Sequence, residues 1–103
     1  MAYSVITSRI AKRDIADIGK YIATESQSLE MAIKVVDEIE RQILDLNQMP
    51  KRYALVSDER LSQKGFRSIP IKNYIIFYVV EEQAKTVNIV GVLHNKRDWI
   101  NLL

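Results

Sequence analysis

The segment Val92–Trp99, with the sequence VLHNKRDW, contains the chain's only histidine and its only tryptophan. Because an imidazole titrates at a pH of about 6.5, His94 could act as a general base or a general acid close to neutral pH. In the alternative interpretation, His94 is the polar end of a strand and Trp99 anchors the C-terminal tail. The segment is therefore either a reactive site or a packed chain end.

Basic residues elsewhere in the second half of the chain could join His94. Antiparallel pairing of three predicted strands could bring Arg67, Lys72 and Arg97 close to it. Guanidinium groups bind phosphate oxygens through paired hydrogen bonds, and an imidazole can activate a 2′-hydroxyl, so this set could cleave RNA without a metal ion. The candidate catalytic residues are His94, Arg67 and Arg97, and the candidate substrate-binding residues are Lys72, Lys96 and Tyr74.

These residues also have ordinary structural explanations. A single histidine at a strand end is more often a surface or hydrogen-bonded residue than a catalyst. Tyr74 and Tyr78 could stack on bases, but the run Tyr74–Val80 is apolar throughout, which is typical of core residues. The sequence therefore leaves catalysis as one hypothesis among others.

Composition excludes several classes of site. One histidine and no cysteine leave no metal-binding cluster or disulfide framework, and no glycine-rich phosphate loop is present, so we expect neither a metal nor a cofactor. No apolar run approaches the roughly 18 residues that a membrane span requires. Residues 51–103 carry nine Lys/Arg against five Asp/Glu, which favours an anionic partner or reflects an ordinary solvated surface. We expect a cytoplasmic protein without membrane association.

Apolar periodicity predicts the fold. Ser8 can cap a helix that ends near Ser26, and Ser28 can cap a second helix that ends before Pro50. The expected inward stripes are Ala11, Ile15, Ile18 and Ile22 in the first helix, and Ala32, Val36, Ile39, Ile43 and Leu46 in the second.

The rest of the chain is rich in β-formers. A short strand is expected at Tyr3–Thr7, and a polar connector without periodicity at Lys51–Gly65. Three further runs predict an antiparallel meander, with Pro70 in a peripheral strand: Phe66–Ile71, Tyr74–Val80 and Thr86–Leu93. The predicted fold class is α+β, one domain over residues 1–103, with a helical hairpin on one face of the sheet.

Motifs distributed along the whole chain resemble those of the RelE/ParE superfamily of toxins from bacterial type II toxin–antitoxin modules. The motifs are Tyr3-x-Val5, Ala11-x-x-Asp14-Ile15, Tyr21-Ile22, Leu46-x-x-x-Pro50, Gly65-Phe66-Arg67, Tyr74-x-x-x-Tyr78 and Leu93-His94-x-x-Arg97-Asp98. The resemblance implies a fold similar to microbial ribonucleases and a cognate antitoxin that wraps the toxin and neutralises it.

The resemblance implies two different activities on one scaffold. RelE-like members cleave mRNA in the ribosome, with His94 and the arginines as the implied site, whereas ParE-like members inhibit DNA gyrase without chemistry of their own. Ile75 and Ile69 occupy positions where RelE-like nucleases have basic residues. The leading expectation is a ribosome-dependent mRNA endoribonuclease, and the alternatives are a gyrase inhibitor or an inactive homologue that binds an antitoxin.

Overall fold

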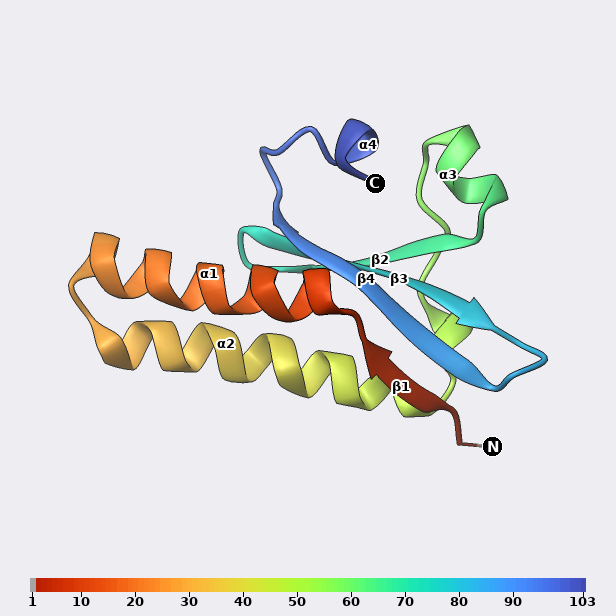
Figure 1. Cartoon of the computed structure of the whole chain (residues 1–103), viewed down its shortest axis with the longest axis horizontal. Coiled ribbons are helices and arrows are strands. Elements are labelled where there is room, and N and C mark those ends of the chain that lie inside the picture. Colours follow the sequence, from red (N-terminus) through yellow and green to blue (C-terminus); the bar gives the residue numbers. More distant parts are fainter. Residues whose placement is uncertain (1) are drawn as a thin grey trace.

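The computed structural model describes residues 2–103, so of the expected domain only Met1 lies outside the described residues. Two long helices cover one face of a four-stranded sheet, and two short helices lie on its other face (Figure 1). The main elements are β1 (Ser4–Thr7), α1 (Arg9–Ser26), α2 (Leu29–Leu44), β2 (Phe66–Ile71), β3 (Tyr74–Glu81) and β4 (Thr86–His94). The predicted α+β class and helical hairpin are confirmed.

The helices begin where the serine caps predict. Ser8 Oγ accepts a hydrogen bond from Ala11 N at 3.0 Å, and Ser28 Oγ accepts one from Met31 N at 3.1 Å. The predicted stripes are buried with two exceptions, because Ile22 and Val36 are only half-buried. In α2, Val35 takes the fully buried position facing the core.

The sheet has the order β1-β4-β3-β2. β2, β3 and β4 form the predicted antiparallel meander, and β1 pairs parallel with β4. The apolar strand β3 is covered on both faces, as predicted, with Ile76 and Tyr78 toward the long helices and Phe77 in the cluster on the other side. Pro70, which has no N–H to donate, lies on the edge strand β2, as expected.

The connector Lys51–Gly65 is more regular than predicted. It contains part of a 3-10 turn, η2 (Pro50–Arg52), and a short helix, α3 (Glu59–Gln63), in which Leu61 is completely buried. A turn, η1 (Asp45–Asn47), follows α2, and the C-terminal tail forms α4 (Trp99–Leu102). Helices of four or five residues are too short to show an apolar period, so the sequence analysis missed them.

A β-bulge in β4 lets the beginning of α1 bind the strand directly. The pairing register shifts between Phe77 and Tyr78, which leaves Val90 without a partner residue on β3. Ser8 compensates, because its N–H donates to the Ile89 carbonyl at 3.1 Å and its hydroxyl donates to the Val90 carbonyl at 3.2 Å. The N-terminal end of α1 is therefore fixed to the irregular part of β4.

Asp14 makes the second link between α1 and β4. Its Oδ2 accepts a hydrogen bond from the backbone N–H of the buried Val92 at 3.0 Å. A Cβ atom on Gly91 would lie 3.2 Å from the same oxygen, so glycine at this position leaves room for the carboxylate. Burial raises the pKa of Asp14, and this effect outweighs the hydrogen bond from Val92, which lowers it.

A charged cluster joins three segments at the opposite end of the sheet. Glu82 accepts hydrogen bonds from Tyr3 Oη at 2.5 Å, from Lys51 Nζ at 2.7 Å and from Lys85 Nζ at 2.9 Å. The hydrogen bond from Lys51 makes the largest contribution to lowering the pKa of Glu82 to about 2. Because the residues come from both ends and the middle of the chain, the cluster ties β1 to the β3–β4 turn and to η2.

Within the described part of the chain, no helix has the combination of length and apolar content needed to cross a bilayer.

The Asp14 contact predicts a difference between two substitutions. Asp14→Ala leaves the buried N–H of Val92 without an acceptor and should lower the free energy of unfolding by about 1–3 kcal/mol. Asp14→Asn keeps a side-chain oxygen and should retain more than half of that stability. Urea denaturation at pH 7 measures both, and an alanine variant as stable as the asparagine variant would contradict the assignment.

The Glu82 cluster predicts a pH-dependent contribution to stability. Because the folded-state pKa of Glu82 lies below its ordinary value of 4.5, the contribution is present above pH 4.5 and is lost as the pH falls toward 2. Glu82→Gln should therefore lower Tm at pH 7 but have little effect near pH 2. Glu81→Gln changes the exposed neighbouring residue and serves as the control. Equal Tm losses for Glu82→Gln at both pH values would refute the prediction.

Candidate functional site

A hollow with a volume of about 470 Å³ lies between the middle of α1 and the C-terminal end of β4. Helix α1 contributes one face of regularly spaced side chains to it, from Asp14 through Ile18 to the exposed Tyr21. Val92 and the buried Tyr74 also line it, from β4 and β3. The hollow therefore has an apolar and aromatic lining held by three elements.

His94 is placed in the hollow by the end of β4. Tyr74 and His94 are paired residues in neighbouring strands, and their rings meet edge to face with centroids 5.4 Å apart. Lys96 N donates to His94 Nδ1 at 3.1 Å, so Nδ1 is an acceptor in the turn that follows β4. Burial, and to a smaller extent Tyr21, raises the pKa of Tyr74.

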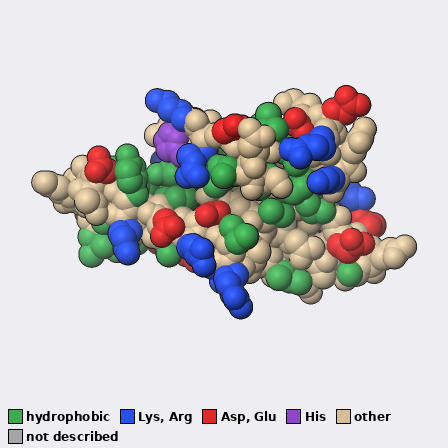
Figure 2. Space-filling model, turned by 45° about the horizontal axis from the view of Figure 1, so that its top comes forward, with side chains coloured by type: hydrophobic (Ala, Val, Ile, Leu, Met, Phe, Trp, Pro, Cys, Tyr) green, Lys and Arg blue, Asp and Glu red, His purple; other side chains and the backbone are tan. Residues whose placement is uncertain are grey.

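The turn after His94 brings two cations to the rim of the hollow. Asn95 N donates to the Asn73 carbonyl at 2.8 Å, and Arg97 N donates to the His94 carbonyl at 2.9 Å. The exposed side chains of Lys96 and Arg97 line the hollow together with His94, and Figure 2 shows the histidine side chain at the surface with basic side chains beside it. The structure therefore brings these three predicted residues together.

The opposite rim of the hollow is acidic. Asp14 and Asp17 lie there on α1, and the negative charge of Asp17 adds to the raised pKa of Asp14. Arg97 acts in the other direction and lowers the pKa of Asp14. The hollow thus presents carboxylates on its helix side and cations on its strand side, around an aromatic centre.

Arg67 does not join this group, so the expectation that it would lie near His94 is wrong. Arg67 pairs with Tyr78, whereas His94 pairs with Tyr74, which separates them by about 13 Å along β3 and by about 10 Å across the sheet. The guanidinium of Arg67 donates instead to the main-chain carbonyl of Tyr53 at 2.6 Å. Its contacts are those of a residue that fixes a loop.

Lys72 does not line the hollow that contains His94. It occupies the β2–β3 turn with a left-handed backbone (φ of 53°) and lines a different hollow between α2 and β2. Lys34 and Glu38 of α2 line that second hollow. Trp99, by contrast, packs on Phe77 with ring centroids 5.1 Å apart, which confirms its role as an anchor.

The sequence analysis missed the contribution of α1 to the hollow. Asp14, Ile18 and Tyr21 recur at spacings of four and three residues, which is the signal of a single helix face. The apolar stripe of a helix predicts which of its side chains are buried. It does not predict which other helix or strand they pack against. The missing information was the tertiary contact between α1 and the end of β4.

The arrangement is suited to binding a polar, charged surface. Its cations and carboxylates lie on opposite rims and can pair with opposite charges on a partner, and its aromatic centre can receive an apolar or planar group. One imidazole with a single guanidinium in the same hollow is a smaller set than the one predicted for RNA cleavage.

The fold matches those of chains in solved structures of toxin–antitoxin systems and of a free toxin. The Pseudomonas aeruginosa chromosomal ParDE system contains a chain that matches with a TM-score of 0.74 at 21% identity, over 90% of this chain and 96% of that one. A variant of the Escherichia coli toxin RelE in the free state matches with a TM-score of 0.70 at 13% identity, over 99% and 93%. The Mycobacterium tuberculosis RelBE2 toxin–antitoxin complex matches with a TM-score of 0.66 at 21% identity, over 91% and 99%.

At these identities the structural matches establish the fold, and both RelE-like and ParE-like proteins share it. No curated protein sequence is significantly similar to this chain. The family assignment comes from the model of the ParE toxin of the type II toxin–antitoxin system parDE, which matches residues 5–99. The chain therefore belongs to the ParE toxin family and is a toxin of a type II toxin–antitoxin system.

Proposed function

We propose that this toxin acts in the cytoplasm as a ParE-like inhibitor of DNA gyrase, by binding the enzyme and without catalysing a reaction of its own. A cognate antitoxin neutralises it. The observation that carries the proposal is the separation of Arg67 from His94, because it removes a cation from the set that RNA cleavage would use.

Metal-independent cleavage of RNA needs a proton-transfer group and cations within contact distance of one phosphodiester. Arg67 is separated from His94 by the width of β3 and four residues of its length, which is more than one phosphate can bridge. Its Nη1 also donates to the main-chain carbonyls of Lys51 and Tyr53, which holds the guanidinium beside that segment of the chain.

Two isoleucines add to this argument. Ile69 is 3% exposed and packs in the core beneath the long helices, where burial would disfavour the charge of a lysine. Ile75 packs against the cluster on the other face of the sheet. The positions at which RelE-like nucleases have basic residues serve apolar packing in this chain.

The family assignment and the relatives support an antitoxin partner. The matched family model is that of the ParE toxin, and relatives of the same fold occur in the ParDE system and in RelBE toxin–antitoxin complexes. These relationships favour binding of a proteinaceous antitoxin by this chain as well.

Within this proposal, the hollow beside His94 forms part of the surface that binds the target. Lys96 and Arg97 provide exposed positive charges, and Asp14 and Asp17 provide negative ones, so a partner must match both rims. The ring of His94 forms part of the wall of this surface. Its Nδ1 accepts a hydrogen bond from Lys96 N, which holds the turn that carries the two cations.

A second candidate function is ribosome-dependent cleavage of mRNA. The observation in its favour is that His94, Arg97, Lys96 and Tyr74 line one open hollow. A ribosome that positions the RNA could complete a weak site, since orientation alone contributes a large part of a rate enhancement. In that case His94 would be the general acid or base, and Arg97 would bind the scissile phosphate.

The two candidates differ in what accumulates after the toxin is induced. A gyrase inhibitor should leave transcripts intact, cause broken DNA with an SOS response, and block supercoiling by purified gyrase in a manner that the antitoxin reverses. Primer extension on cellular mRNA and a supercoiling assay with purified proteins make the comparison. Transcripts cut within codons, together with uninhibited gyrase, would refute the proposal in favour of the ribonuclease.

Substitutions in the hollow provide a second test. His94→Gln should retain growth arrest within about threefold of the wild type, because no proton transfer is required. Arg97→Glu should weaken gyrase inhibition by about tenfold or more, because it places a third carboxylate beside Asp14 and Asp17. Dose–response curves of supercoiling and growth measure both effects. Loss of toxicity in His94→Gln with an unchanged melting temperature would assign a chemical role to His94.

A further inference from the structure

The hollow beside His94 is lined by charged side chains that form no ion pair within the described chain. Asp17, Lys96 and Arg97 line it, and all three side chains are exposed. Five ion pairs join other described residues, and none of them includes a residue of this hollow. Burial raises the pKa of Asp14, and Arg97 lowers it across the hollow without pairing with it. The two rims therefore face each other with their charges uncompensated.

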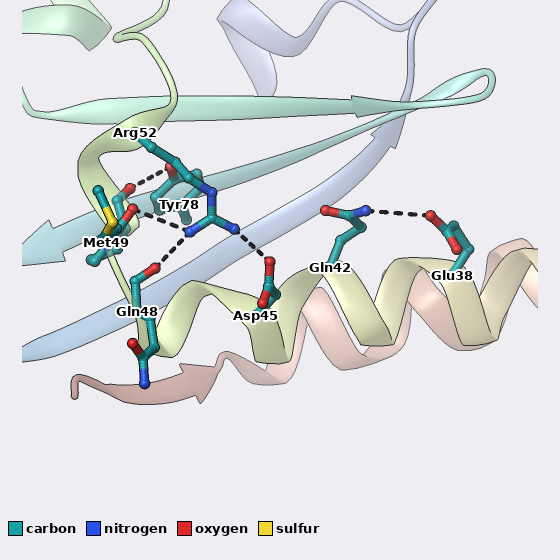
Figure 3. A network of polar contacts seen from close by, with 8 residues as sticks. Glu38, Gln42, Asp45, Gln48, Met49, Arg52 and Tyr78 are labelled. Atoms are coloured by element: carbon teal, nitrogen blue, oxygen red, sulfur yellow. Dashed lines mark hydrogen bonds and ion pairs between the residues drawn. The ribbon is translucent and has the colours of Figure 1, made fainter. Parts of the chain in front are cut away.

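Arg52 is an example of a cation whose bonding is complete within the chain. It pairs with Asp45 at 2.7 Å and donates to the carbonyls of Gln48 at 2.6 Å and Met49 at 3.2 Å, as Figure 3 shows. Among the described residues, no carboxylate pairs in this way with a cation of the hollow. The cations of the hollow are therefore free to pair with a partner.

The acidic rim places two carboxylates on one face of α1. Asp14 and Asp17 are three residues apart, a spacing that brings side chains of a helix together. The fold accounts for Asp14, whose Oδ2 accepts a hydrogen bond from Val92 N at 3.0 Å. Within the described chain, Asp17 has no ion pair that would offset the repulsion between the two like charges. The charge of Asp17 is therefore the feature that remains to be explained.

Aromatic rings lie between the two rims. Tyr21 follows Asp17 by one turn of α1 and is 59% exposed, and the rings of Tyr74 and His94 meet edge to face on the strand side. A guanidinium group is planar and weakly hydrated, so it stacks on aromatic rings, and its N–H groups bind carboxylate oxygens in pairs. An ammonium group has neither the planar shape nor the paired donors. The helix side of the hollow therefore fits a guanidinium better than an ammonium.

The strand side of the hollow has the opposite preference. Lys96 and Arg97 are consecutive exposed cations, and they are complementary to a carboxylate. The volume of about 470 Å³ lies within the range of about 300–1,000 Å³ that is usual for sites that enclose a small ligand. The hollow therefore has room for side chains of a partner, and its charges match a cation and an anion that lie side by side.

We propose that this hollow receives an arginine of the target protein, together with an acidic residue next to it on the target's surface. The guanidinium lies on the ring of Tyr21 and pairs with Asp14 and Asp17. The neighbouring carboxylate pairs with Lys96 and Arg97. This inference rests on the proposed function, in which toxicity results from protein binding, and it names the groups that the hollow recognises.

The first test removes single groups of the hollow. Asp17→Asn removes a charge and Tyr21→Leu removes a ring, both at exposed positions, so Tm should be unchanged. Each should weaken gyrase binding and growth arrest by about tenfold, because the guanidinium loses a carboxylate or an aromatic contact. Tyr21→Phe keeps the ring and should retain more of both than Tyr21→Leu. Glu25→Gln removes a charge from an exposed position of α1 outside the hollow, and it should leave both unchanged.

The second test uses small probes and does not involve gyrase. The full-length toxin is titrated with acetyl-arginyl-glutamate amide, acetyl-lysyl-glutamate amide and guanosine monophosphate, while NMR follows the backbone amides of Tyr21 and His94. The arginine peptide should reach half-saturation at a concentration at least about threefold lower than the lysine peptide, and Asp17→Asn should remove this preference. Equal binding of the two peptides, no binding of the arginine peptide, or tighter binding of the nucleotide would overturn the inference.

Antitoxin binding distinguishes the target from the antitoxin as the source of the arginine. Wild-type affinity of Asp17→Asn for the antitoxin, together with weakened growth arrest, supports the inference. Weakened antitoxin binding with undiminished growth arrest would assign the arginine to the antitoxin and overturn it. If the wild type arrests growth without inhibiting gyrase, the proposed function fails. The growth arrest by Asp17→Asn and the peptide titration then still decide whether the hollow receives an arginine of the target.

Discussion

The hydrogen bond between the Asp14 carboxylate and the Val92 backbone N–H is the contact on which the functional end of the molecule depends. It fixes the regular helix α1 to the irregular end of β4, and a glycine at position 91 gives it room. Through it, the turn that carries His94 and Arg97 lies opposite the acidic face of the helix. Together with the two Ser8 hydrogen bonds, this part-buried contact joins two elements that are separated by most of the chain.

The sequence was sufficient to predict the two long helices, the meander and the central position of β3. Those predictions rest on local signals, namely the caps at Ser8 and Ser28 and the apolar run Tyr74–Val80. The candidate site was predicted only in part. His94 and Arg97 lie close together because they are three positions apart in the sequence. The position of Arg67 depends instead on the strand register and on hydrogen-bond acceptors in a distant loop. The periodicity of apolar residues predicts neither the strand register nor these acceptors.

Arg67 and Arg97 show how the same residue type can have different roles. Arg97 is exposed beside a hollow, whereas Arg67 is half-buried and donates to the main-chain carbonyls of Lys51 and Tyr53. The fold that this chain shares with the ParDE and RelE structures permits such changes of partner without a change in the arrangement of helices and strands.

The parallel pairing of β1 with β4 has a consequence for the cell that makes this protein. Residues 4–7 pair with residues 86–89, so the sheet is incomplete until nearly the whole chain has been synthesised. Chains leave the ribosome with the N-terminus first, and long-range pairings are the slowest to form. A chain that has been synthesised only as far as residue 85 therefore cannot form this pairing, and β1 remains without its neighbouring strand until β4 is made.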